Sequence, residues 1–255
     1  MINISPPLTH LAHLDVQLKT RGYAILNAAS VCAWANCSLQ ELSQMQASWN
    51  DMPVDQYLKD GGSYRKRRHS SFKFQGEALT LVPHRAHWQP LTYNALHGGM
   101  TRWFEPMATG IVESATWQKL LTAFAKTANQ LSADDLSGSP AAVQCIEAHQ
   151  FRIEAVDGGI GRPTPEGAHR DGVDLVGVFM VDRQNIKGGE TRVFDAAGSS
   201  GERFTLQESW SLLLLDDAKV VHETTPIRPL ATLGFRDTLV LTSRCNSFLD
   251  ASPSP

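Results

Sequence analysis

A histidine and an aspartate stand one residue apart in the segment EGAHRDGVDLVGVFMV, residues 166–181. These are His169 and Asp171. Side chains at positions i and i+2 of an extended segment point to the same side of the chain, so both can bind one metal ion. His222 follows a later apolar run and a turn in LLLLDDAKVVHETTPI. Two histidines and one carboxylate, with three coordination positions open, are typical of a non-haem Fe(II) site. Zinc more often takes a closed tetrahedral set.

A second chemical signal lies 14 positions beyond His222 (236 − 222), in the predicted strand LGFRDTLVLTS. Because side chains alternate between the two faces of a strand, Arg236, Thr238 and Val240 share one face. A buried guanidinium without a partner is costly. Asp237 points to the other face and is a poor local partner. The pattern therefore favours a bound carboxylate, held by Arg236 with a further hydrogen bond from Thr238.

The N-terminal part carries helix signals. Leucines at helical spacing precede Gly22, which suits a helix C-cap, and Ser38 with Glu41 three positions later forms a capping box. A long apolar stripe predicts a helix over about 111–131. Residues 53–110 show no clear period, and we expect irregular segments and short strands there.

The pattern changes near residue 140. Over about 141–245, short apolar runs are separated by turn residues, which is typical of a sandwich or jelly roll and not of βαβ units. We expect one domain over residues 1–255, of α+β class with a mainly β core. The helix-rich part, about 1–140, would support that core.

Composition limits the possible partners and compartments. A formal net charge of −3 over 255 residues gives no field that would attract nucleic acid. Four scattered cysteines do not form a disulfide framework, and neither an export signal nor a membrane span is visible. These features predict a cytoplasmic protein with a small-molecule partner. They indicate no oligomeric state.

Four short motifs in a fixed order carry a resemblance to a known family: HRD at 169–171, GGET at 188–191, VVHETTPI at 220–227 and FRDT at 235–238. The sequence resembles the Fe(II)/2-oxoglutarate-dependent dioxygenases, most of all the bacterial branch of free L-amino-acid hydroxylases such as L-isoleucine 4-hydroxylase. The similarity runs from about His149 to Arg244.

The resemblance implies a fold, a cofactor and a reaction. The fold would be a double-stranded β-helix, the jelly roll of the cupins. His169, Asp171 and His222 would hold Fe(II), while Arg236 and Thr238 would bind the distal carboxylate of 2-oxoglutarate. Dioxygen would be consumed, succinate and carbon dioxide released, and an unactivated C–H bond of an aliphatic amino acid (Ile, Leu or Met type) hydroxylated. Ascorbate would stimulate turnover. Related halogenases lack the carboxylate ligand, so Asp171 favours hydroxylation.

The substrate residues are predicted from weaker signals. The segment YRKRRHSSF at 64–72 shows some similarity to the family, which suggests that Tyr64 and Arg65 reach the substrate. A solvated charge run is the alternative interpretation. Gln150 and Arg152 share one face of the strand leading to the metal loop and could line the pocket.

Other histidines and two other functions complete the expectations. Five histidines are expected to be ordinary hydrogen-bonded residues: His69, His84, His87, His97 and His149. One alternative function keeps the chemistry but acts on a peptidyl residue or another metabolite. The other is a non-redox, cupin-like protein that binds a metal or ligand.

Overall fold

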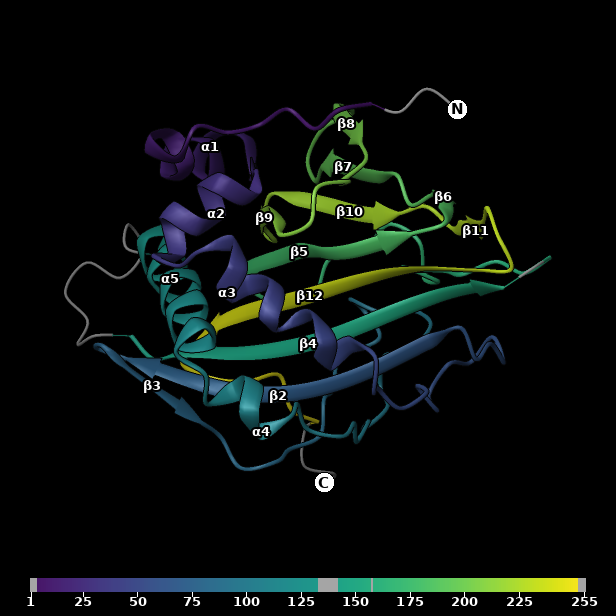
Figure 1. Ribbon diagram of the computed structural model, residues 1–255. Helices are drawn as coiled ribbons and strands as arrows, with labels where there is room; N and C mark the ends of the chain where they lie inside the picture. The colour runs from purple at the N-terminus through teal and green to yellow at the C-terminus, as the bar shows by residue number, and fades with distance from the viewer. Residues whose placement is uncertain (1–3, 133–141, 157, 252–255) are drawn as a thin grey trace.

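The computed structural model describes residues 4–132, 142–156 and 158–251. The helices gather on one side of a large sheet (Figure 1). They are η1 (Leu11–His13), α1 (Leu14–Arg21), α2 (Ala28–Ala35), α3 (Leu39–Gln44), η2 (Gln46–Trp49), α4 (Thr109–Val112) and α5 (Ala115–Ser132). The strands are β1 (Tyr23–Leu26), β2 (Arg65–Gln75), β3 (Ala78–Leu81), β4 (Gln144–Val156), β5 (Leu175–Gln184), β6 (Ile186–Gly188), β7 (Thr191–Asp195), β8 (Gly201–Phe204), β9 (Ser211–Asp216), β10 (Val220–Thr224), β11 (Ile227–Pro229) and β12 (Leu233–Cys245).

Seven strands form one antiparallel sheet in the order β1-β9-β5-β12-β4-β2-β3. Two smaller sheets, β10-β7-β8 and β11-β6, lie beside it. The longest pairing joins β12 to β4, and β12 also pairs with β5 on its other side. This mainly β architecture with supporting helices confirms the jelly-roll prediction, since short antiparallel strands that bury one face need a second layer to cover it.

The main hydrophobic core lies between the helices and the outer face of the large sheet. Trp117 and Phe124 of α5 are fully buried there, together with Phe179 of β5 and Leu241 of β12. A Cβ on Gly177 of β5 would lie 2.9 Å from the Phe124 ring, so the close approach of helix and sheet requires glycine at this position. The opposite face of the large sheet is left to form the site.

Several local predictions are confirmed. Gly22 ends α1 with φ of 75° and donates its N–H to Leu18, as a left-handed C-cap does. Ser38 and Glu41 form the capping box of α3. The helix expected over 111–131 is divided into α4 and α5, because the Ser114 hydroxyl accepts the Trp117 N–H and begins a new helix.

The expectation of irregular segments and short strands for residues 53–110 is wrong for β2, which is 11 residues long. The solvated charge run is also wrong for part of this strand. Arg65 and Arg67 are buried, while Lys66 and Arg68 are only half-buried. The pattern of apolar residues does not predict this strand, because the side chains that it points inward are charged.

The change of pattern near residue 140 falls within 133–141, outside the described residues. Strands from both sides of that point share one sheet: β1 pairs with β9, and β2 pairs with β4 on one side and with β3 on the other. The two patterns are therefore interleaved in space.

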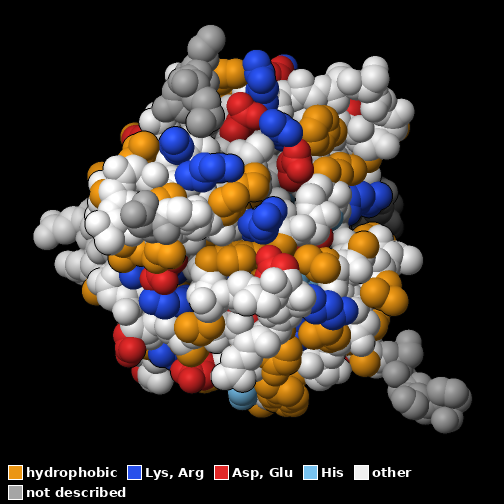
Figure 2. Space-filling model, turned by 90° about the vertical axis from the view of Figure 1, so that its right-hand side faces the viewer, with side chains coloured by type: hydrophobic (Ala, Val, Ile, Leu, Met, Phe, Trp, Pro, Cys, Tyr) orange, Lys and Arg blue, Asp and Glu red, His pale blue; other side chains and the backbone are white. Residues whose placement is uncertain are grey.

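The part of the chain that the structure describes contains no helix both long and apolar enough to cross a membrane. Figure 2 shows the right-hand end of Figure 1, where Lys and Arg side chains are interspersed with Asp, Glu and hydrophobic side chains. The face in this view carries no continuous basic surface of the kind that binds nucleic acid.

Candidate active site

A cavity lies between the large sheet and β10. Because strand side chains alternate, every second residue of β4 and β12 faces it, among them Glu147, His149, Arg236 and Thr238. His222 of β10 and the loop before β5 line it as well. The cavity thus collects side chains that are far apart in the sequence.

The three predicted metal ligands converge here. His169 Nε2 lies 3.9 Å from Asp171 Oδ1, and His222 Nε2 lies 3.9 Å from Asp171 Oδ2. These separations are too long for hydrogen bonds, but one ion with bonds of about 2.0–2.2 Å can span them. Burial and the neighbouring His169 ring lower the pKa of His222, so its imidazole is neutral and free to donate a lone pair. The donor set fits Fe(II).

Backbone contacts hold the two imidazoles side by side. His169 and His222 form an isolated β-bridge in which each N–H donates to the other's carbonyl at 3.0 Å. The Gly167 carbonyl lies 2.9 Å from His169 Nδ1 and can only accept, so Nδ1 carries the proton. The lone pair of His169 is therefore on Nε2, the atom that faces Asp171.

Asp217 fixes the loop that carries Asp171, the predicted carboxylate ligand. Its Oδ1 accepts the N–H of Asp171 at 2.9 Å, and its Oδ2 accepts those of Gly172 and Val173 at 2.7 and 3.2 Å. Burial and the Asp171 carboxylate raise the pKa of Asp217 to about 6, even though these three hydrogen bonds favour the ionised form. In LLLLDDAK the two aspartates resemble an ordinary turn after a strand. The sequence alone therefore does not single out Asp217.

Replacing Asp217 with asparagine should weaken Fe(II) binding by about 10- to 100-fold, the usual effect of removing a group that orients a ligand. An asparagine side chain has a single acceptor oxygen, so it can replace either Oδ1 or Oδ2 of Asp217 but not both. The backbone N–H groups bound to the other oxygen then lose their hydrogen-bond acceptor. Equilibrium titration with Fe(II) under nitrogen measures the change. Asp195→Asn, at an exposed aspartate of β7, is the matched control and should bind iron like the wild type. Equal affinity in Asp217→Asn would rule out this role.

Arg236 is 4 % exposed and has no carboxylate partner among the described residues. Asp237 pairs instead with Arg152, at 2.6 Å between Oδ2 and Nη2, on the other face of the sheet. Burial, and then repulsion from Arg183, lower the pKa of Arg236 to about 10, so it is still charged at neutral pH. An anion in the cavity would offset this buried charge. The Trp49 indole donates to the Thr238 carbonyl at 3.2 Å and anchors the strand from behind.

The structure does not bring all the predicted substrate residues to the cavity. Arg65 lines it, but its Nε donates to Asp55 at 2.7 Å. The Tyr64 hydroxyl donates to Asp60.

The other two predicted substrate residues lie on the helix side of β4. Gln150 donates to the Ser48 hydroxyl, and Arg152 is paired with Asp237. The alternation of β4 is as expected, but the opposite set, with His149 and Phe151, faces the cavity. Each set contains polar side chains, so polarity could not identify the cavity face.

The sequence model of a family described as 2OG-Fe dioxygenase matches residues 46–242 of this chain. The chain belongs to the 2OG-Fe dioxygenase family. This dioxygenase therefore uses Fe(II), 2-oxoglutarate and dioxygen, in agreement with the donor set and with the unpaired Arg236.

Three relatives show how far the likeness extends. A bsmA homolog from Methylobium petroleophilum PM1 is 46% identical, with a TM-score of 0.88 over 97% of this chain and 98% of that one. The 3(1)-hydroxy-L-isoleucine 4-dioxygenase of Pantoea ananatis is 24% identical over 84% of this chain and 85% of its own. IDO from Bacillus thuringiensis shares the fold, with a TM-score of 0.75 at 16% identity, over 93% of this chain and 100% of its own.

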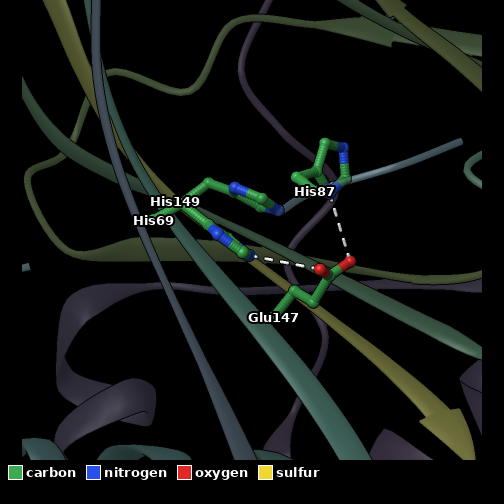
Figure 3. A group of neighbouring side chains, drawn as sticks. All are labelled: His69, His87, Glu147 and His149. Carbon is green, nitrogen blue, oxygen red and sulfur yellow. Dashed lines mark hydrogen bonds and ion pairs between the residues drawn. The ribbon is translucent and has the colours of Figure 1, made fainter. Parts of the chain in front are cut away.

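His69, His87, Glu147 and His149 form a second polar cluster (Figure 3), and all of them except His69 line the same cavity. His69 Nε2 and His87 Nδ1 each lie 3.2 Å from a different oxygen of Glu147, and Arg85 donates to Glu147 at 2.9 Å. The histidines are hydrogen-bonded, as expected, but their grouping was not predicted.

Acid should destabilise the dioxygenase through this cluster. Burial, with a smaller opposing effect of Glu147, lowers the pKa of His87 to about 4, whereas an unfolded histidine titrates near 6.5. Between these two values the unfolded chain binds more protons, so stability falls as the pH falls from about 6.5 to about 4. His87 alone contributes about 3 kcal/mol to that loss. Urea unfolding at several pH values measures it.

The variant His87→Gln isolates the contribution of this one group. Glutamine keeps a donor for Glu147 but does not titrate, so the pH dependence over the window should be weaker than in the wild type. His13→Gln, at an exposed histidine, should leave the dependence unchanged. Identical pH profiles for wild type and His87→Gln would contradict the assignment.

Proposed function

We propose that this dioxygenase hydroxylates a free aliphatic L-amino acid, using 2-oxoglutarate and dioxygen. The observation that carries the proposal is that the converging His169, Asp171 and His222 share one cavity with the buried, unpaired Arg236. The Pantoea ananatis relative, named for an L-isoleucine derivative, supports an amino-acid substrate. Val178 and Val240 add an aliphatic wall to the cavity, which suits an aliphatic side chain.

Each group in the proposal has a separate task. His169, Asp171 and His222 would hold Fe(II), and Arg236 with Thr238 would grip the distal carboxylate of 2-oxoglutarate. Bound Fe(II) supplies the oxidation, in which 2-oxoglutarate and dioxygen become succinate and carbon dioxide while one oxygen atom enters a substrate C–H bond. The protein orients the two organic molecules and limits the access of water.

A screen of the twenty L-amino acids by mass spectrometry tests the proposal. We expect at least one aliphatic amino acid to gain one oxygen atom, with an equal amount of succinate, only when Fe(II), 2-oxoglutarate and dioxygen are present. Ascorbate is included to keep the iron reduced. The variant His222→Ala is the negative control.

The other outcomes identify the alternatives. Tight binding of 2-oxoglutarate without turnover of any amino acid would favour a peptidyl or other metabolite substrate. The absence of succinate under every condition would favour a non-redox protein of the cupin type. A cytoplasmic location is part of the proposal, and the four free cysteines support it because such thiols persist in reducing compartments.

A further inference from the structure

Two buried arginines in the cavity lack a carboxylate partner and are not needed for 2-oxoglutarate. Arg67 of β2 is 5 % exposed, and Arg102, in the segment before α4, is 2 % exposed. Arg67 lies against the rings of Phe104 and Phe151, at 4.0 and 4.5 Å from their centroids. Within the described part of the chain, neither guanidinium forms an ion pair, and the Nε of each has no hydrogen-bond partner.

The neighbouring arginines behave differently. Arg65 is paired with Asp55 at 2.7 Å, and Arg85 with Glu147 at 2.9 Å. Burial, and then the charge of Arg102, lower the pKa of Arg67 well below its usual range, against the opposing effect of Asp55 and Glu147. A buried guanidinium without a direct ion-pair partner is costly. An anion bound in the cavity by both guanidiniums would reduce that cost.

This pair is separate from the Arg236 site. In the sheet, Arg67 is opposite Phe151 of β4, and Phe151 is opposite Thr238 of β12. With two strand spacings of about 4.8 Å, the backbones at Arg67 and Thr238 are about 10 Å apart. A 2-oxoglutarate carboxylate on Arg236 and Thr238 would therefore leave Arg67 and Arg102 available to a second molecule.

The pair is connected to the metal ligands by one side chain. Arg102 donates to Gln89 Oε1 at 3.1 Å, and Gln89 Nε2 donates to Asp171 Oδ1 at 3.2 Å. Arg102 is thus two hydrogen bonds away from Asp171, and both residues line the same cavity.

An unpaired acid lies in the same cavity. The Glu166 side chain is nine-tenths buried, and its Oε2 has no partner in the described residues. Its Oε1 lies 3.6 Å from His169 Nε2. Glu166 and Arg102 line the same cavity, and the charge of Glu166 opposes the lowering of the Arg102 pKa by burial. A buried carboxylate oxygen beside an anion site is complementary to an ammonium group.

The histidine cluster does not itself suit a metal ion. Arg85 donates a hydrogen bond to Glu147, and Arg67 donates to His149 Nδ1 at 2.9 Å. A metal ion bound by this cluster would have to displace both guanidinium groups. The His69 and His149 rings stack at 4.6 Å with an interplanar angle of 16° (Figure 3). The cluster instead holds His149 in place, and His149 positions Arg67.

We propose that Arg67 and Arg102 bind the carboxylate of the substrate, that Glu166 binds its ammonium group, and that Gln89 ties this subsite to Asp171. The inference rests on the proposed function, because it assumes that a second small molecule enters the cavity beside 2-oxoglutarate. It narrows the substrate to a molecule carrying both charges, as free amino acids do and internal peptide residues do not.

The first test changes the ligand and needs no variant. The protein is loaded with Fe(II) and 2-oxoglutarate under nitrogen, and its Tm is measured with each of the twenty L-amino acids. The amino acid that raises Tm most is then compared with its amide and its N-acetyl derivative. Both derivatives should lose most of the rise in Tm. A rise with the amide equal to that with the acid would overturn the carboxylate subsite, and an unchanged rise with the N-acetyl derivative would overturn the role of Glu166.

The second test changes the protein. Arg67→Met and Arg102→Met should each raise the Kd of that amino acid by about 10- to 100-fold, as expected for a lost charge-assisted contact, while the Kd of 2-oxoglutarate changes little. Arg68→Met is the matched control, because Arg68 of the same strand bonds to the Asp51 and Pro106 carbonyls. Unchanged amino-acid affinity in both variants would refute the inference. If they do not fold, the Lys variants, which keep the charge, and the ligand comparison still decide it.

Two results separate this inference from the proposed function. If 2-oxoglutarate binds but no amino acid changes Tm, the subsite is refuted while dioxygenase chemistry on another substrate stands. If 2-oxoglutarate itself does not bind, the proposed function fails first. Metal analysis adds an independent check: one Fe(II) per chain agrees with a positioning role for the histidine cluster, and two would contradict it.

Discussion

The variant His222→Ala should lose Fe(II) binding and all 2-oxoglutarate-dependent succinate formation, yet remain folded. The imidazole is one of three donors, and two remaining donors on a single loop cannot close the site around the ion. The loss of Fe(II) affinity should exceed roughly 100-fold, which is the largest usual effect of removing a residue that only orients a metal ligand. Asp171→Ala should behave in the same way. Iron content after equilibrium dialysis and succinate release measure both effects.

Folding and specificity need separate controls for these variants. His222 lies in β10, whose backbone pairing with β7 does not depend on the imidazole, so the circular dichroism spectrum should match that of the wild type. His13→Ala removes an exposed histidine and should keep full iron content. Wild-type iron binding in either His222→Ala or Asp171→Ala would refute the metal site.

Arg236→Ala should raise the Kd of 2-oxoglutarate by about 10- to 150-fold, with little change in Fe(II) affinity. This corresponds to the loss of a charge-assisted hydrogen bond of about 1.5–3 kcal/mol. The guanidinium is buried and has no other carboxylate to hold among the described residues, so the co-substrate should depend on it. Isothermal titration of the iron-loaded protein under nitrogen gives the affinity.

Arg192→Ala provides the matched control, because Arg192 is half-exposed and paired with Glu190 and Glu223 on the smaller sheet. Its 2-oxoglutarate affinity should equal that of the wild type. An unchanged affinity in Arg236→Ala would show that a different cation holds the co-substrate. Arg67 would then be examined first, since it lines the same cavity and forms no ion pair in the described part of the chain.

The sequence was sufficient to predict that His169, Asp171 and His222 converge, because their geometry depends on local rules. Two residues apart on an extended segment, His169 and Asp171 must point the same way, and the apolar runs beside them and before His222 predict buried strands. The same alternation places Arg236 and Thr238 together. These side chains share one cavity because β10 lies across from β12, which the jelly-roll prediction already implied.

The rest depends on contacts that no local pattern reveals. The inward face of β2 is charged, so Arg67 sits in a strand that an apolar search cannot find. On β4, both Gln150 and His149 are polar, and only the position of the helices decides which one meets the cavity. Asp217 acts on the backbone N–H groups of a loop 46 positions earlier (217 − 171), an approach that appears only in three dimensions.

The order of the large sheet also determines when the chain can fold during synthesis. β1 at Tyr23–Leu26 must wait for β9 at Ser211–Asp216, and β2 must wait for β4, while β4 in turn pairs with the last strand, β12. Until almost the whole chain has left the ribosome, the early strands expose unpaired edges, which favour aggregation. We therefore expect yield in a cell to depend on translation speed and on chaperones more than on the stability of the finished protein.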